Sequence, residues 1–381
     1  MCAAACVGPL EDPWRPPPST DAGRAAPALG GSIEREGDRD AGEAKFDGAL
    51  GASADLGASA DLGAPDSGHP DMGADDGLAP LFVAFGHGER TLVSCDGGRT
   101  WVGERAEALE PPGGDWSHSP HAARALVFAQ GWFFYAAGWG APRIVRRSRD
   151  GVRWEDVVPR GEASDNWSGV GTRSGVIFGQ ANRGQRSLDS GQTWARIAPP
   201  GDGKGLYASS GDTVLLASLG ARSLIARSED DGTTWTSFPV TGALTDCLEQ
   251  PRGFASAEGK AGLVSADGAF CFSGDDGRTW RRGADVPGGG VRSLVAVPPG
   301  LRAYGSSGAF ESEEGSSWTR LGAGPPAAAV TRGASTWVAL VEGELRASVD
   351  GLTWTPASAP GGGAPLQHVA FGRSVRPQAC R

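Results

Sequence analysis

A short pattern that recurs along the chain constrains its fold more than any other feature of the sequence. In its full form it begins with Ser, ends with Trp, and carries Asp at the third place and Gly at the fifth. Full copies occupy 94–101, 187–194, 228–235 and 273–280, and copies one residue shorter occupy 148–154, 312–318 and 348–354. The closing tryptophans stand 53, 40, 41, 45, 38 and 36 residues apart. One turn motif per unit of roughly 40–50 residues is typical of the four-stranded blades of a β-propeller.

The residue types of the pattern indicate a hairpin turn. An Asp side chain can accept hydrogen bonds from backbone N–H groups of its own turn, and the following Gly supplies the positive φ that a tight turn needs. Thr then starts the next strand, and Trp buries a large ring against it. We therefore expect each copy to join the third and fourth strands of a blade, and its acidic residue to be structural rather than catalytic. These residues are Asp96, Asp150, Asp189, Asp230, Asp275, Glu314 and Asp350.

The recurring pattern resembles the Asp-box, or BNR, repeat, which is found in sialidases, sortilin-type receptors, some xyloglucanases and photosystem assembly factors. The resemblance covers essentially all of residues 79–381 and implies an all-β propeller. It leaves the function open, because hydrolases and binding proteins share the repeat.

Counting strands predicts how the ring closes. The first blade shows only three strands, at 82–85, at 91–94 and from Thr100 onward, whereas a further strand at 366–372 follows the seventh turn and has no turn of its own. We expect this C-terminal strand to complete the N-terminal blade, because closure removes the two free edges of an open array. The prediction is a seven-bladed propeller of four-stranded antiparallel blades over residues 79–381.

The net charge of −10 lies in the leading segment. Residues 1–78 hold 15 acidic and 5 basic side chains, which leaves 30 of each sign in the remainder. This segment is rich in Gly, Ala, Pro and Asp and repeats GASADL at 51–56 and 57–62, so we expect a disordered acidic tether. The balanced remainder lacks the basic field typical of nucleic-acid binding, and no apolar run has the length of a membrane-spanning helix.

The first residues resemble the end of a bacterial lipoprotein signal. Three alanines precede Cys6, which would then be the lipidated residue and could anchor the chain to a membrane. The alternative is that the early cysteines occur by chance in a disordered tail. On the first interpretation we expect a bacterial, extracytoplasmic protein that is secreted, periplasmic or held at the cell surface.

Four further cysteines fall into two pairs, one pair per blade. Cys95 and Cys380 belong to the first blade, and Cys247 and Cys271 belong to the fifth. Two disulfides in an oxidising compartment would fit this placement, with the first pair locking the ring. Four buried free thiols are the alternative, because the first and third strands of a blade are separated by the second.

We expect a ligand on the face opposite the recurring turns, around the central channel, where propellers usually bind. The links and hairpins of the first three blades combine aromatic and polar residues there: Trp116, His118, His121, Arg124, Trp139, Arg143, Asn166 and Trp167. Such a set suits a protein or glycan ligand, although the tryptophans could instead pack long loops onto the disc. His118 and His121 lack a third ligand, so no metal site is predicted.

The alternative function is that of a sialidase-like glycosidase, which needs three arginines, a Tyr–Glu pair and an acid. Candidates for these roles are Arg124, Arg173, Arg292, Tyr207 and Glu249, with Asp115 or Asp165 as the acid. The Arg-Ile-Pro motif of sialidases is absent, the chain has only three tyrosines, and sialidases have six blades. The sequence therefore favours a monomeric, non-catalytic binding propeller without a cofactor.

Overall fold

The computed structural model describes residues 78–106, 116, 119–138, 144–157, 168–180, 183–201, 205–218 and 223–380. The expected acidic tether, including Cys6, lies outside these residues except for Leu78, which already belongs to the first strand. None of the described helical segments is long and apolar enough to cross a membrane.

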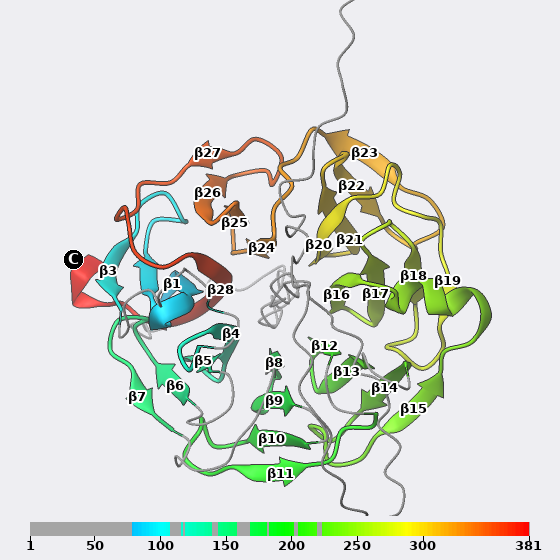
Figure 1. Ribbon diagram of the computed structural model, residues 1–381, viewed down its shortest axis with the longest axis horizontal. Helices are drawn as coiled ribbons and strands as arrows, with labels where there is room; N and C mark the ends of the chain where they lie inside the picture. Colours follow the sequence, from blue (N-terminus) through cyan, green and yellow to red (C-terminus); the bar gives the residue numbers. More distant parts are fainter. Residues whose placement is uncertain are drawn as a thin grey trace, which may run out of the picture. The chain divides into compact units, whose positions relative to one another are not determined.

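The described residues form seven four-stranded antiparallel sheets arranged as blades around a common axis (Figure 1). Named from the axis outward, blade one has β28 (Leu366–Val375), β1 (Leu78–Gly86), β2 (Thr91–Ser94) and β3 (Val102–Arg105). Blade two has β4 (Ala123–Ala129), β5 (Trp132–Ala137), β6 (Ile144–Ser148) and β7 (Glu155–Asp156). Blade three has β8 (Ser168–Gly171), β9 (Val176–Gln180), β10 (Arg183–Ser187) and β11 (Ala195–Ile197). Blade four has β12 (Gly205–Ser210), β13 (Thr213–Ser218), β14 (Leu224–Ser228) and β15 (Thr236–Pro239).

The last three blades repeat this order. Blade five has β16 (Pro251–Ala257), β17 (Lys260–Ser265), β18 (Phe270–Ser273) and β19 (Arg281–Arg282). Blade six has β20 (Val291–Val297), β21 (Gly300–Gly305), β22 (Gly308–Ser312) and β23 (Thr319–Gly322). Blade seven has β24 (Ala329–Arg332), β25 (Trp337–Val341), β26 (Glu344–Ser348) and β27 (Thr355–Pro356). Three short 3-10 helices are η1 (His87–Glu89), η2 (Gly242–Leu248) and η3 (Gln378–Cys380).

The C-terminal strand closes the ring, as the strand count predicted. β28 is the innermost strand of blade one and pairs along the whole of β1, with Val369 opposite Ala84 and Phe371 opposite Phe82. The chain then continues outward to η3, which lies against β3. There Cys380 is joined by a disulfide to Cys95, which directly follows β2, so the C-terminal end of the chain is also held covalently to blade one.

The second disulfide joins Cys247 to Cys271 within blade five. Cys247 lies in η2, which packs over β17, β18 and β19, and not on the inner strand of the blade. The separation of the first and third strands is therefore no obstacle, because the link before the blade carries the cysteine outward to β18. Both pairs that the sequence pointed to are bonded.

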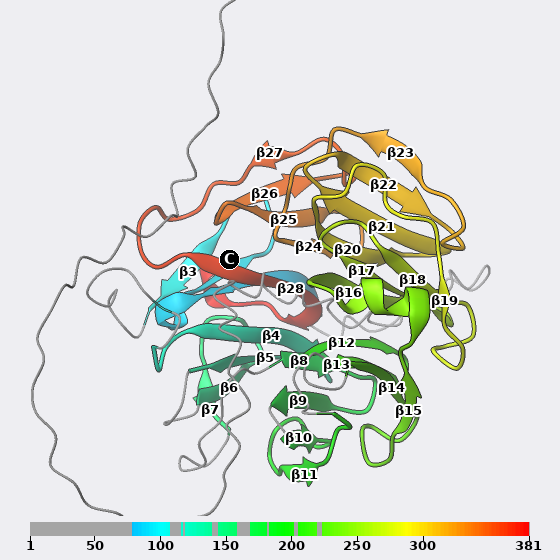
Figure 2. The ribbon, with the colours of Figure 1, turned by 45° about the vertical axis from the view of Figure 1, so that its right-hand side comes forward.

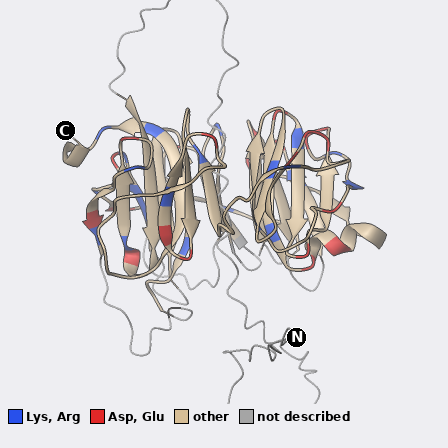
Figure 3. Cartoon of the chain, turned by 90° about the horizontal axis from the view of Figure 1, so that it is seen from above, with Lys and Arg blue, Asp and Glu red and all other residues tan. Residues whose placement is uncertain are grey.

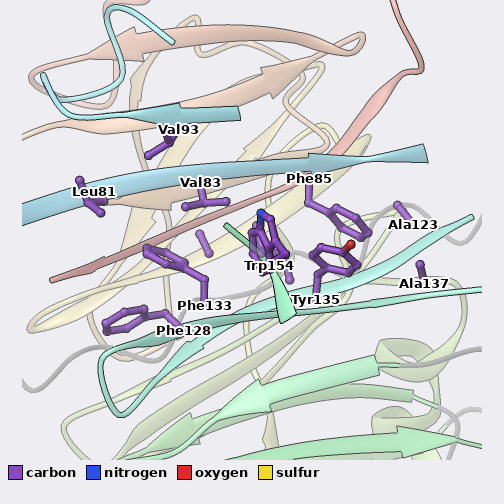
Figure 4. Packing of buried hydrophobic residues seen from close by; sticks show 12 residues of the cluster. Leu81, Val83, Phe85, Val93, Ala123, Phe128, Phe133, Tyr135, Ala137 and Trp154 are labelled. Atoms are coloured by element: carbon purple, nitrogen blue, oxygen red, sulfur yellow. The ribbon is translucent and has the colours of Figure 1, made fainter. Parts of the chain in front are cut away.

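Hydrophobic side chains fill the spaces between neighbouring blades. Between blades one and two, Phe85 stacks on Tyr135 with ring centroids 4.3 Å apart, and Tyr135 lies 4.6 Å from Trp154 (Figure 4). Phe85 and Phe133 are fully buried in the same cluster. Burial of a Phe side chain stabilises a fold by about 1.5–3 kcal/mol, so these contacts hold adjacent blades together.

The recurring turns, which we call the Asp turns, have the expected bonding. In the first, Asp96 Oδ1 accepts from Ser94 Oγ at 2.9 Å and Asp96 Oδ2 accepts from Thr100 Oγ1 at 2.6 Å. Trp101 Nε1 donates to Gly98 O at 2.9 Å, and Gly98 has a φ of +88°. The carboxylate thus binds the two ends of its own turn.

The sixth Asp turn corrects one prediction. Glu314 occupies the acidic position, but its carboxylate makes no hydrogen bond to the described residues, and Ser312 Oγ alone accepts from Gly315 N at 2.9 Å. Trp318 Nε1 donates to Ala284 O of the preceding blade instead of to its own turn. The extra methylene of Glu places the carboxylate out of the geometry that Asp satisfies.

Antiparallel pairing gives the ring two different faces. The Asp turns and the hairpins between first and second strands lie on one, which we call the turn face. The hairpins between second and third strands and the links between blades lie on the other, the link face. Figures 2 and 3 show the strands running between these faces, and the edge view of Figure 3 shows Lys or Arg and Asp or Glu spread over the blades.

Candidate functional site

On the turn face, polar side chains serve contacts between blades. Arg227 Nε donates to Asp276 O of the next blade at 2.6 Å, and Arg302 Nη1 donates to Asp350 O at 2.9 Å. Equivalent contacts run from Arg147 to Ser190, from Arg186 to Asp230, from Arg281 to Glu314 and from Ser374 to Gly131. Because these groups are already bonded, the turn face is a poor candidate for a ligand site.

The link face of blades one and two is built on a buried carboxylate. Glu89, in η1, is 1% exposed and accepts from Tyr135 Oη at 2.6 Å and from Arg146 Nη1 at 2.9 Å through Oε2. Its other oxygen, Oε1, lies 2.6 Å from His121 Nδ1. We call these four residues the Glu89 hub. The hub joins the second-to-third-strand hairpin of blade one to the link, the second strand and the third strand of blade two.

The backbone of η1 explains how Glu89 points inward. Gly88 and Glu89 both have positive φ, +66° and +57°, so the turn between β1 and β2 is unusually tight. Gly88 N donates to His121 O at 2.9 Å, which anchors the turn on the link before β4. A Cβ at Gly86 would lie 2.3 Å from Pro365 O, so only Gly allows the approach of the link before β28.

The electrostatics of the Glu89 hub indicate a structural role. Burial raises the pKa of Tyr135 far above its usual value, and the charge of Glu89 raises it further. Burial alone would lower the pKa of Arg146, but its hydrogen bond to Asp156 and the neighbouring Tyr135 and Glu89 raise it. Tyr135 therefore remains a phenol that donates to the carboxylate. It is 1% exposed, so this Tyr–Glu pair offers no nucleophile to a substrate.

Beside the hub, His87 packs flat against Trp116, with ring centroids 5.4 Å apart and planes within 4°. His87 Nδ1 accepts from Ala123 N at 3.0 Å, which places the ring proton on Nε2. Burial and the charge of Arg124 lower the pKa of His87 to about 4. At neutral pH this half-buried imidazole is an uncharged donor beside a guanidinium.

Three residues of the predicted ligand set lie in the described part of this face: Trp116, His121 and Arg124. Trp116 is 5% exposed and its ring is covered by His87, so it packs the link onto the disc and is not an open platform. Its Nε1 has no hydrogen-bond partner among the described residues. The other members, His118, Trp139, Arg143, Asn166 and Trp167, lie outside the described residues, as do Asp115 and Asp165.

The residues named for a sialidase do not come together. Arg124 and Arg292 lie at the link-face starts of β4 and β20, whereas Arg173 follows the end of β8 and lies on the turn face. Arg173 is on the turn face because the first strand of blade three is only Ser168–Gly171 and ends before it. The remaining two are also separate: the Tyr207 side chain is buried against blade three, and Glu249 is exposed before β16.

Sequence reasoning missed Glu89, Tyr135, Arg146 and His87. From the sequence alone, a charged residue in the hairpin 87–90 is expected to be exposed to solvent. No local pattern shows that the backbone at Gly88 turns the side chain of Glu89 inward. The positive φ at Glu89 depends on contacts with the link of the next blade, which sequence spacing does not report. Among the described residues, no cluster of three or more His, Cys, Asp or Glu could hold a metal ion.

Comparison with known proteins shows the fold. No family model matches the chain, and no curated protein matches it. A putative 6-phosphogluconolactonase from Bacteroides fragilis superposes with a TM-score of 0.50 at 10% identity, covering 79% of this chain and 100% of that one. YCF48 from Cyanidioschyzon merolae gives 0.46 at 16% identity, covering 65% and 87%. The GH74 enzyme of Niastella koreensis gives 0.43 at 17% identity, covering 74% and 55%. The chain is a seven-bladed β-propeller, and at these identities the likeness extends to the fold alone.

Proposed function

We propose that this chain is an Asp-box propeller that acts as a non-catalytic binding module, and that a segment of a protein partner docks on the link face of blades one and two. The observation that carries the proposal is the Glu89 hub. It fixes His121 and the turn that bears His87 while both side chains remain partly exposed. A surface held in place before binding loses little conformational entropy on binding, which suits recognition.

A protein ligand fits this surface better than a glycan does. Sugar binding uses open aromatic rings for stacking, but the described Trp116 is buried. Among the described residues, the partly exposed side chains of this face include His87 and Arg124, and imidazole and guanidinium donors pair with peptide carbonyls and carboxylates. The glycosidase alternative has no support from the geometry, because the residues required for it are divided between the two faces.

We also propose that the protein works as a monomer outside the cytoplasm. The two disulfides support this placement, because such bonds persist in oxidising compartments and are rare in the cytosol. Lipidation at Cys6 would add a membrane anchor, and it is part of the same proposal. Protein isolated from its native cells without reductant should resist thiol labelling at all four propeller cysteines, and full labelling there would refute the placement.

Site-specific photocrosslinking tests the binding face. A benzoylphenylalanine at the exposed link residue Pro120 should capture a partner protein in native extract, whereas the same group at Arg173, on the turn face, should not. The captured band should weaken several-fold when His121→Ala or Arg124→Gln is added. Equal capture from both faces, or hydrolysis of fluorogenic sialosides by the purified chain, would count against the proposal.

A further inference from the structure

The second residue of each Asp turn points out of the turn face. In the first turn, Ser94 and Asp96 bond each other, so the residue between them faces the opposite way. The second residues are all at least partly exposed, and from blade one to blade seven they are Cys95, Arg149, Leu188, Glu229, Gly274, Glu313 and Val349. Leu188 and Val349, 47% and 67% exposed, are the exposed large hydrophobic side chains of the described residues. Both therefore lie on the turn face.

Charge is divided unevenly over the turn face, counted over the Asp turns, the hairpins between first and second strands with one flanking residue on each side, and the chain from Arg373 to Cys380. Blades seven, one and two, which we call the basic sector, have six arginines and three aspartates, and each aspartate is bound within its own turn. The arginines are Arg99, Arg149, Arg153, Arg332, Arg373 and Arg376. Blade three has one charge of each sign, whereas blades four to six have nine acidic and two basic side chains. An anionic surface is therefore attracted to one side of the turn face and repelled by the other.

Three arginines of the basic sector are exposed and form no ion pair with the described residues: Arg99, Arg149 and Arg376. They are not among the groups that bridge neighbouring blades. Arg149 Cζ lies 4.6 Å from the centroid of the partly exposed Trp132 ring. Gln130, in the same hairpin as Trp132, donates from Nε2 to Leu188 O at 3.2 Å. A cation, an amphipathic ring and an open aliphatic side chain thus meet at the junction of blades two and three.

This combination is typical of a protein surface that lies on a lipid bilayer. Guanidinium groups bind lipid phosphates, aliphatic tips enter the boundary between headgroups and acyl chains, and tryptophan prefers that same depth. Seven copies of one turn at equivalent places in a ring present their second residues at one level, which suits a planar partner. Leu78 lies at the turn-face end of β1, so the preceding chain joins the disc on this side.

We propose that the basic sector, together with Leu188, docks on the surface of an anionic phospholipid membrane. The same surface repels the acidic side chains of blades four to six, so the disc contacts the membrane by one side of its turn face. The link face of blades one and two then points away from the lipid, where a partner protein can reach it. The proposal needs neither that partner nor lipidation at Cys6.

Vesicle sedimentation of the full chain tests the role of charge. Cys6→Ser removes any acyl group, and every variant keeps the same leading segment. The chain should bind vesicles of phosphatidylcholine and phosphatidylglycerol in equal parts but not vesicles of phosphatidylcholine alone, and about 0.5 M salt should release it. Arg99→Gln, Arg149→Gln and Arg376→Gln together should weaken binding at least ten-fold, because one basic residue near such a surface contributes about five-fold.

The matched control has the same net charge and changes arginines outside the turn face. It carries Arg252→Gln and Arg292→Gln, at β-bulges on the link-face ends of β16 and β20, and Arg320→Gln on the outer strand β23. It should bind the mixed vesicles as the unmodified arginine set does. Melting curves show whether each variant is folded.

A second pair of measurements separates a bilayer from a soluble acidic partner. Leu188→Ser with Val349→Ser should weaken vesicle binding several-fold, because the apolar tips no longer enter the bilayer. An environment-sensitive fluorescent amino acid at Val349 should shift its emission to the blue on vesicles, whereas the same group at Pro120, on the link face, should not. Lipid docking would be overturned if the chain did not bind the mixed vesicles, if the arginine variant and its control bound equally, or if the shift occurred at Pro120 alone. Binding of soluble polyglutamate as tight as vesicle binding, with no loss in the Leu188, Val349 variant, would assign the surface to an acidic protein instead.

Discussion

Thr213 Oγ1 donates to Asp276 Oδ2 at 2.6 Å across the junction of blades four and five. Asp276 is the fourth residue of its Asp turn, the position that the short turns lack, and its φ is +61°. At the junction of blades three and four, Asp231 holds the same position and its Oδ1 accepts from Thr172 Oγ1 at 2.9 Å. At the junction of blades two and three, Ser190 holds it and its N–H donates to Gln130 Oε1 at 2.9 Å. The extra residue of these full turns therefore ties each blade to the one before it.

Asp276→Ala should lower the free energy of unfolding by about 1–3 kcal/mol, the usual effect of losing hydrogen bonds to a charged group. Arg227, which is 7% exposed, would lose one of its two carboxylate partners, since Glu229 remains. Calorimetric melting measures the effect. Asp267→Asn serves as the control because the Asp267 side chain is exposed and forms no hydrogen bond or ion pair with the described residues, so it should leave the melting temperature unchanged. Equal melting of the two variants would remove the role assigned to Asp276.

The Asp turns should make stability fall in acid. The hydroxyl and backbone N–H of Thr193 lower the pKa of Asp189 to about 2, and the backbone N–H groups of Thr353 and Leu352 lower that of Asp350 to about 2. A lowered folded-state pKa means that this stabilisation is complete above about pH 4 and is lost as pH falls toward 2. The melting temperatures of wild type and the Asp189→Asn, Asp350→Asn chain should differ at pH 6 and converge near pH 2. A difference that stays constant with pH would show that charge is not the cause.

Glu89→Gln should destabilise the protein by about 1–3 kcal/mol, because it takes the buried carboxylate away from the half-buried guanidinium of Arg146, which keeps its ion pair with Asp156. The amide keeps the size of the side chain, so any loss reports charge and hydrogen bonding. Denaturant unfolding followed by tryptophan fluorescence measures it. Tyr135→Phe, which removes one donor only, should cost less, and the two changes together should cost less than their sum because they share a bond. Additive effects would argue against a coupled hub.

The fold was predictable because its signal is local. Each Asp turn is specified within eight residues: Asp96 and Thr100 bond each other, and Gly98 adopts the φ that the turn requires. Seven such turns predict seven blades, and the C-terminal strand that has no turn of its own predicts how the ring closes. The failure at Glu314 is also local, since one methylene separates it from Asp.

The candidate site was only partly predictable, because its geometry depends on residues far apart in the chain. Arg124 and His121 were found as polar residues in a long link, but the carboxylate that organises them, Glu89, lies in another blade. The bulges at Arg252 and Arg292 shift the pairing by one residue, and a bulge becomes visible only when the partner strand is known. A prediction from side-chain alternation alone would place one of these arginines in the buried core, or would shift the predicted strand by one residue.

The two disulfides should contribute unequally to stability. Cys95 and Cys380 are 285 residues apart, whereas Cys247 and Cys271 are 24 apart. In the chain-entropy view a disulfide acts by restricting the unfolded chain, which gives about 5–6 kcal/mol for the longer loop and about 3–4 kcal/mol for the shorter. Paired Cys→Ser variants of each bridge, unfolded in denaturant, should therefore rank in that order. If the Cys247, Cys271 variant were the less stable, the contribution would come from native packing of η2 against β18, because both sulfurs of that bridge are buried while Cys95 and Cys380 are only partly so.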